Sequence, residues 1–133
     1  MLKKRLIFAL LWESGDFCLS RNFRLQRVGD LAWLMNQYRF DNVAAAIDEL
    51  ILLDVTRGQR LSQSFLETVS VFADIMQVPI SAGGGIRDVV DARKLLRSGA
   101  DKLVINSLFS DPTNNLKAIR DQFGQQSVVA SVD

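Results

Sequence analysis

Short apolar runs alternate with amphipathic, helix-period patterns from residue 30 onward, and this alternation constrains the fold more than any other feature. It is typical of βα units, in which helices connect the strands of a parallel sheet and cover it. The sequence predicts strands at residues 5–11, 48–54, 78–82, 101–106 and 127–132. It predicts helices at residues 30–43, 62–77, 88–98 and 112–123. The expected architecture is therefore α/β with a parallel sheet.

Two of these helices have clear end signals. Asp88 can cap the helix at 88–98, and Gly99 can end it in the left-handed conformation. In the same way, Asp111 is expected to cap the next helix, and Gly124 to end it.

A weak internal repeat marks two of the strand starts. Residues 47–52 read Ile-Asp-Glu-Leu-Ile-Leu, and residues 100–105 read Ala-Asp-Lys-Leu-Val-Ile. Two βα units separate the copies, as expected for a fold built from similar units.

One long segment, residues 12–29, lacks a clear pattern and is expected to be a loop. It contains a turn at Ser14–Asp16 and the bases Arg21, Arg24 and Arg27. Loops of this length often act as lids or binding segments. A solvated excursion without a function is an equally good interpretation.

Small and polar residues follow two neighbouring strands where each strand ends. Three glycines, Gly83–Gly85, come directly after the run 78–82, and Asn106 and Ser107 follow the next strand. Glycines let backbone N–H groups approach an anion, and the N-terminus of the following helix adds partial positive charge. Both strands are expected to direct donors at one phosphate. Alternatively, the glycines only make a tight turn, and Asn106 only closes another.

The charge balance restricts the classes of partner. Sixteen basic and fifteen acidic residues give a net charge of +1, so no overall field attracts nucleic acid or acidic lipid. Any phosphate binding must therefore be local. The loop arginines alone do not make a nucleic-acid site.

Composition also limits the chemistry and the compartment. The single cysteine, Cys18, excludes an internal disulfide and suits a reducing compartment, so a cytoplasmic location is expected. The lack of histidine argues against a metal site, and no cofactor is expected. No stretch is long enough to span a membrane. The apolar run after Arg5 is short and Glu13 follows it, which favours a buried first strand over a secretory signal.

Short segments spread over the whole chain match one known family in order. They are residues 2–7, 22–23, 29–30, 48–50, 53–54, 83–87, 91–102, 106–107 and 123–133. Together they resemble the cyclase subunit of imidazole glycerol phosphate synthase, a (βα)8 TIM barrel of histidine biosynthesis. The resemblance implies that residues 1–133 form a single half-barrel domain, with about four βα units and the fifth strand of the roughly 250-residue barrel.

A half-barrel would leave a sheet edge and an apolar inner face exposed. Three arrangements could cover them: the rest of a longer protein, a homo-oligomer of half-barrels, or a separate second-half chain.

The resemblance also assigns roles to particular residues. It implies that Gly84, Gly85, Asn106 and Ser107 hold one of two phosphates of a phosphorylated small-molecule substrate.

In the family, ammonia travels through the barrel from a glutaminase subunit docked at its N-terminal face. Arg5, Glu49 and Lys102 match the charged gate of this route, and Asp101 matches a residue that contacts the glutaminase. The three gate residues could instead form only a stabilising ion-pair ring.

The match is incomplete at the catalytic residues. The family uses two aspartates as general acid and base. Asp133 matches one of them, whereas the other falls on Leu11, and a substrate-holding lysine falls on Leu19. Loss of one such group typically lowers the rate by about 10²- to 10⁴-fold. Glu13 would share a strand face with Leu11 and could substitute for the missing aspartate.

Relatives from surface-polysaccharide gene sets carry leucine at the first aspartate position, and residues 126–133 resemble that branch. In those relatives the ammonia is thought to form an amidino group on a sugar. The expected function is thus a cyclase-like subunit that uses ammonia from a glutaminase. The alternatives are an ammonia-transfer subunit of the polysaccharide branch and a non-catalytic half-barrel that binds phosphate or oligomerises. Whether the chain is an enzyme stays open.

Overall fold

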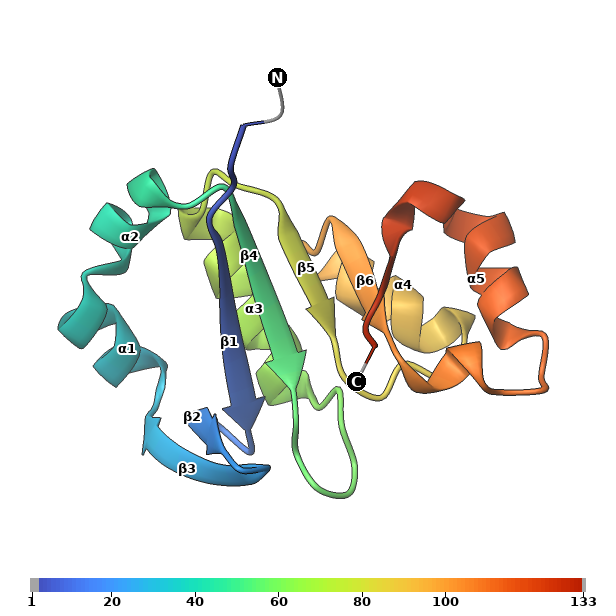
Figure 1. Cartoon of the computed structure of the whole chain (residues 1–133), viewed down its shortest axis with the longest axis horizontal. Coiled ribbons are helices and arrows are strands. Elements are labelled where there is room, and N and C mark those ends of the chain that lie inside the picture. The colour runs from blue at the N-terminus through green and yellow to red at the C-terminus, as the bar shows by residue number, and fades with distance from the viewer. Residues whose placement is uncertain (1–2, 133) are drawn as a thin grey trace.

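The computed structural model describes residues 3–132, apart from the side chain of Asp41. Its strands form one sheet in the order β3-β2-β1-β4-β5-β6-β7 (Figure 1). The strands are β1 (Ile7–Glu13), β2 (Asp16–Arg21), β3 (Arg24–Gly29), β4 (Glu49–Asp54), β5 (Ile80–Gly83), β6 (Lys102–Ile105) and β7 (Val128–Ala130). The α-helices are α1 (Leu31–Tyr38), α2 (Phe40–Ala46), α3 (Gln63–Ile75), α4 (Val89–Arg97) and α5 (Asn115–Phe123). Two 3₁₀ turns, η1 (Ser107–Phe109) and η2 (Gln125–Ser127), complete the described elements.

The predicted parallel α/β sheet is confirmed. Strands β1, β4, β5, β6 and β7 are parallel neighbours in that order. Leu53 pairs with Gly83, and Gly83 pairs with Val104, so the carboxyl ends of β4, β5 and β6 lie side by side. Polar residues that follow these strands are therefore brought to one edge of the sheet.

The predicted loop at residues 12–29 is wrong, because this segment is a β-hairpin. β2 pairs antiparallel with β1 and with β3. The turns use left-handed residues, with φ of 47° at Ser14 and 51° and 61° at Asn22 and Phe23. Side chains beyond Cys18 in β2 are exposed on both faces, so the hairpin lacks the alternation that signals a strand.

The expected helix at 30–43 is two helices. Asp30 caps α1 by accepting the Trp33 N–H at 2.9 Å, as its chemistry favours. Arg39, in the left-handed conformation (φ 43°), separates α1 from α2.

The other end signals give mixed results. Asp88 caps α4 through the Asp91 N–H at 2.9 Å, Gly99 is left-handed, and Gly124 follows α5. Asp111 does not cap α5, which begins only at Asn115.

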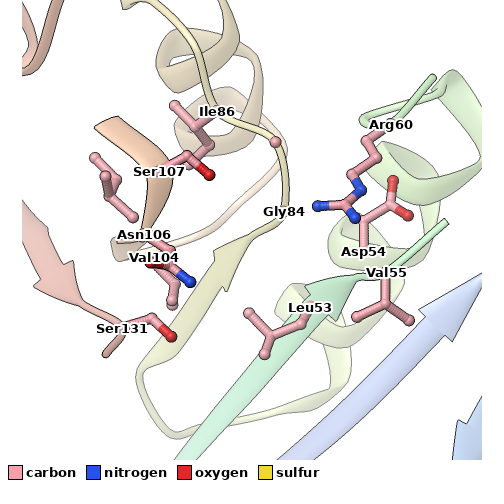
Figure 2. A pocket seen from close by; sticks show the side chains of 12 residues that line it. Leu53, Asp54, Val55, Arg60, Gly84, Ile86, Val104, Asn106, Ser107 and Ser131 are labelled. Carbon is pink, nitrogen blue, oxygen red and sulfur yellow. The ribbon is translucent and has the colours of Figure 1, made fainter. Parts of the chain in front are cut away.

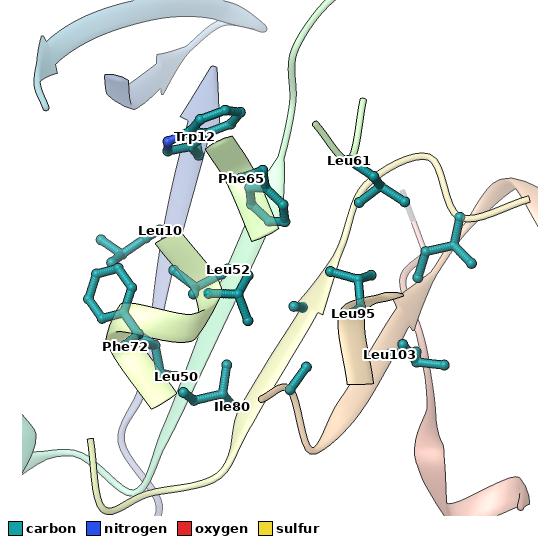
Figure 3. Close-up of a cluster of buried hydrophobic side chains, with 14 of the residues drawn as sticks. Leu10, Trp12, Leu50, Leu52, Leu61, Phe65, Phe72, Ile80, Leu95 and Leu103 are labelled. Carbon is teal, nitrogen blue, oxygen red and sulfur yellow. The ribbon is translucent and has the colours of Figure 1, made fainter. Parts of the chain in front are cut away.

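The hydrophobic core lies between the sheet and its helices (Figure 3). Leu50 and Leu52 of β4 point into it, and they meet Phe65 and Phe72 of α3, all with no exposed side-chain surface. Burial of each such side chain contributes roughly 1.5–3 kcal/mol. This layer therefore holds β4 and α3 in a fixed relation on either side of the loop that joins them.

The opposite face of the sheet has no helical layer in the described part of the chain. In Figure 1, α3 and α4 lie behind the strands, and no helix lies in front of them. Ile7 is 46% exposed on this side, and Leu11, Ile51 and Leu53 are half-buried. The inner surface of the sheet is thus apolar and open.

Candidate functional site

A cavity of about 220 Å³ lies at the carboxyl ends of β4, β5 and β6 (Figure 2). Its lining residues are Leu53, Asp54, Val55, Arg60, Gly84, Gly85, Ile86, Val104, Ile105, Asn106, Ser107 and Ser131. All four residues predicted to bind phosphate, Gly84, Gly85, Asn106 and Ser107, line it. The structure thus brings them together, and what they bind stays a prediction.

The glycines are required by the backbone as well as by the space around it. Gly84 and Gly85 have φ of 122° and 75°, which side-chain-bearing residues rarely adopt. A Cβ at Gly84 would overlap the carbonyl oxygen of Asp54, and one at Gly85 would lie 3.0 Å from Cδ of Arg60. The glycines therefore do make a tight turn, and the same backbone also forms a wall of the cavity.

The N-terminus of α4 contributes less to this cavity than the sequence suggested. Asp88 accepts the Asp91 N–H at 2.9 Å, and the Asp91 carboxylate accepts the Arg87 N–H at 3.0 Å. The first bond satisfies a donor of the first helical turn, and the second satisfies a backbone donor just before the helix. An anion in the cavity would therefore meet the backbone of residues 84–86.

The opposite wall follows β6 and β7. The Asn106 amide and the Ser107 hydroxyl face the cavity in Figure 2, and so does the Ser131 hydroxyl. The Phe109 N–H donates to the Asn106 carbonyl and the Ser110 N–H to the Ser107 carbonyl, both at 3.1 Å, which fixes the turn. Sequence reasoning missed Ser131, because the predicted strand at 127–132 included it, whereas β7 ends at Ala130 and leaves Ser131 just beyond the strand end.

The third side of the cavity is the loop after β4, which Asp54 organises. The Asp54 side chain is 1% exposed, and its carboxylate accepts the N–H groups of Thr56 (3.0 Å) and Leu61 (2.8 Å). The loop therefore folds back over the end of β4 and places Arg60 beside Gly84, as Figure 2 shows. Sequence reasoning did not identify Arg60.

A charged ring lies at the amino-terminal edge of the sheet. Glu49, only 6% exposed, pairs with Arg5 at 2.7 Å and with Lys102 at 3.8 Å, and it accepts the Ser81 hydroxyl at 3.3 Å. A buried carboxylate needs such partners to offset its lost hydration. The three predicted gate residues are therefore in contact, in an arrangement that fits both an ion-pair ring and a gate.

Asp101 has a structural role at the same edge. Its carboxylate accepts the Ile80 N–H at 2.8 Å, and Asp48 accepts the Leu6 N–H at 2.7 Å in the same way. Each aspartate thus ties the start of its own strand to the neighbouring strand. This equivalence gives a physical basis to the repeat seen in the sequence.

Asp133, predicted to be catalytic, lies outside the described residues. Leu11, predicted to occupy the position of the family's other aspartate, pairs with Leu53 in β4 and with Cys18 in β2. Leu19 is 53% exposed in β2.

Glu13 does lie near Leu11, but it has an ion-pair partner. The Arg27 guanidinium is 3.8 Å from the Glu13 carboxylate and 3.6 Å from that of Asp16. Burial raises the pKa of the Cys18 thiol next to this cluster, and the negative charge of Glu13 raises it further. The thiol is therefore kept protonated.

Two kinds of feature are absent from residues 3–132. No helix there is long and apolar enough to cross a bilayer. No three acidic, cysteine or histidine side chains converge there on a position that could hold a metal ion.

Several known proteins and one protein family are similar in sequence to this chain. The model of a family described as histidine biosynthesis protein matches residues 21–133. A protein of Parasynechococcus marenigrum, provisionally named imidazole glycerol phosphate synthase subunit hisF2, is 47% identical over 133 residues, which are 100% of this chain and 49% of that protein. The HisF subunits of Exiguobacterium sp. and Pyrococcus furiosus are 34% and 33% identical, and the alignments cover the whole chain and 51% and 52% of those proteins. The chain thus spans about half the length of the curated relatives it matches.

Proposed function

We propose, from the premise that this chain belongs to the histidine biosynthesis protein family, that its cavity holds the phosphate of a sugar-type substrate. Its fold corresponds to the N-terminal half of the HisF barrel, and residues 1–133 act as one half-barrel unit. Gly84 and Gly85 contact the phosphate from one side, and Asn106 and Ser107 from the other.

The observation that carries this proposal is the convergence of the two strand ends on one cavity. Backbone N–H groups, a side-chain amide and a hydroxyl can all donate to phosphate oxygens. In open α/β sheets, ligands bind outside the carboxyl ends of the strands, where this cavity lies. A turn with no ligand would not need polar groups from both strands.

A thermal melt with and without inorganic phosphate tests the proposal. Phosphate at 100 times its dissociation constant should stabilise the folded chain by about 2.7 kcal/mol. Gly85→Val should lose this protection, and Ser107→Ala should weaken it without the backbone strain that valine introduces. Equal melting curves with and without phosphate would exclude the site.

The charged ring serves as an ammonia gate facing a glutaminase subunit. The ring lies at the amino ends of the strands, at the sheet edge opposite the phosphate cavity. Ammonia entering there and a substrate held at the carboxyl ends would approach each other along the inside of a barrel. Asp101, exposed at the same edge, contacts the partner in this arrangement.

The reaction differs from efficient cyclisation, because Leu11 replaces one member of the acid–base pair. Leu11 and Leu53 are apolar neighbours, and Glu13 is paired with Arg27, so neither supplies the missing proton transfer. This favours the second candidate, an ammonia-transfer subunit of the polysaccharide type. An ammonia-dependent turnover assay distinguishes the two: restoring the pair with Leu11→Asp should raise cyclisation by about 10²-fold or more. Cyclisation by the unaltered chain that Asp133→Asn abolishes would contradict it.

The open inner face is covered in the working protein. Its exposed and half-buried side chains, Ile7, Leu11, Ile51 and Leu53, match a barrel interior. Further βα units, a second copy or a separate half-barrel could supply the cover. If a second copy supplies the cover, sedimentation of the chain alone should show a dimer or larger species, and a cooperatively unfolding monomer would contradict self-association.

A further inference from the structure

We propose that Arg60 is a further anion-binding residue of this cavity and makes it selective for a phosphomonoester over a neutral sugar. The proposal rests on the proposed function, since it adds a cation to the phosphate site formed by the two strand ends. Arg60 lies in the loop between β4 and α3, opposite the wall formed by Asn106 and Ser107 (Figure 2).

The loop fixes the Arg60 side chain at two points. Its Nε donates to the Thr56 carbonyl at 2.8 Å. The two terminal nitrogens of the guanidinium take no part in that bond. Its stem lies against Gly85, where a Cβ would meet Arg60 Cβ at 3.2 Å and Cδ at 3.0 Å. In Figure 2 the guanidinium points toward Gly84 and the cavity.

Asp54 sets the position of this loop. Its carboxylate accepts the N–H groups on both sides of Arg60, from Thr56 and from Leu61, and Leu61 adopts a left-handed φ of 58°. The loop therefore has little freedom to withdraw Arg60 from the cavity. Holding a side chain in its binding geometry lowers the entropy lost on binding.

Arg60 carries the positive charge of this cavity. Among the described residues that line it, only Asp54 and Arg60 are charged, and the Asp54 carboxylate is turned to two backbone donors, the N–H groups of Thr56 and Leu61. Among the described side chains of residues 3–132, no carboxylate lies within ion-pair distance of Arg60. The guanidinium therefore has no ion-pair partner there, and it can form an ion pair with an anion that enters the cavity.

Arginine suits this task better than the neutral donors of the other walls. Its planar fork matches two phosphate oxygens at once, and it remains charged at every physiological pH. The glycine backbone, Asn106 and Ser107 can orient a phosphate, but they leave its negative charge uncompensated. Arg60 accordingly adds affinity for the charged group itself.

The test titrates inorganic phosphate and ribose 5-phosphate into the purified chain and its variants by calorimetry. Arg60→Gln should weaken both ligands by about tenfold, which is the loss of a single charge-assisted contact of about 1.4 kcal/mol. Arg60→Lys, which keeps the charge without the fork, should lose about threefold. Arg57→Gln removes an exposed charge from the same loop outside the cavity and serves as the matched control, with a change below about twofold.

Each result decides one of the two proposals. Phosphate binding that survives in Arg60→Gln within twofold overturns the role of Arg60 and leaves the strand-end site intact. Equal losses in Arg60→Gln and Arg57→Gln also overturn it, because they indicate a general effect of charge. No saturable phosphate binding by the unaltered chain overturns the phosphate site and Arg60 together. The difference between the unaltered chain and Arg60→Gln should also shrink as NaCl rises, which loss of the Thr56 contact alone would not produce.

Discussion

Replacing Asp54 should destabilise the chain and the phosphate cavity at once, because one buried carboxylate holds the loop that carries Arg60. Asp54→Ala removes the acceptor for the Leu61 N–H, and Leu61 is 8% exposed, so water cannot easily replace it. An unsatisfied buried donor costs about 1–3 kcal/mol. The Thr56 N–H is better placed for water and adds about 1 kcal/mol.

The Asp54→Ala variant no longer has to bury a charged carboxylate, and this gain offsets part of the lost stability. The expected decrease in the free energy of unfolding is about 2–3 kcal/mol, and Asp54→Asn, which keeps one acceptor oxygen, should lose about half of it. Urea unfolding followed by circular dichroism measures both values. Phosphate affinity should fall in parallel, since the loop no longer fixes Arg60.

The matched control is Asp111→Ala. Asp111 also accepts a backbone N–H, from Thr113 at 2.8 Å, but at the protein surface. That bond lowers the pKa of Asp111, whereas water can take over the role of its carboxylate. The urea unfolding midpoint of Asp111→Ala should therefore stay near that of the unaltered chain. An Asp54→Ala variant as stable as Asp111→Ala would refute the reasoning.

Two further predictions concern the strand starts and the buried thiol. Asp101→Ala and Asp48→Ala should lower the free energy of unfolding alike, because each aspartate accepts one backbone N–H from a neighbouring strand. Only Asp101→Ala should weaken binding of a glutaminase subunit in a pull-down. Equal weakening by the two variants would argue against a contact at Asp101. Burial raises the pKa of Cys18 above its ordinary 9.0, so the folded state favours the protonated thiol. Its contribution to stability is complete below pH 9.0 and is lost as the pH rises through the folded pKa, and Cys18→Ala should remove this alkaline loss. Native Cys18 should also resist iodoacetamide at pH 8, and rapid alkylation without unfolding would contradict its burial.

The parallel sheet was predictable because it depends on strong, local patterns. The runs that became β4, β5 and β6 are apolar, and helix-period segments separate them. Parallel strands place their carboxyl ends at one edge, so the glycines after β5 and the polar residues after β6 could be brought together from sequence alone. The cavity in the structure is lined by all four predicted residues, Gly84, Gly85, Asn106 and Ser107.

The missed features depend on backbone states and long-range contacts that leave little local signal. The hairpin turns at Asn22 and Phe23, where φ is positive without glycine. The break between α1 and α2 depends in the same way on a left-handed Arg39. Arg60 reaches the cavity only because Asp54, at the end of β4, binds the Leu61 N–H. No pattern within the loop itself indicates that contact.

The most direct test of the phosphate site follows backbone amide resonances while inorganic phosphate is titrated into the chain. The amides of Gly84, Gly85 and Ser107 should shift together and saturate, because they surround one anion. Amides near the charged ring at Glu49, on the other edge of the sheet, should not move. Saturable shifts at the ring with none at the glycines would contradict the account, and so would the absence of any saturable shift.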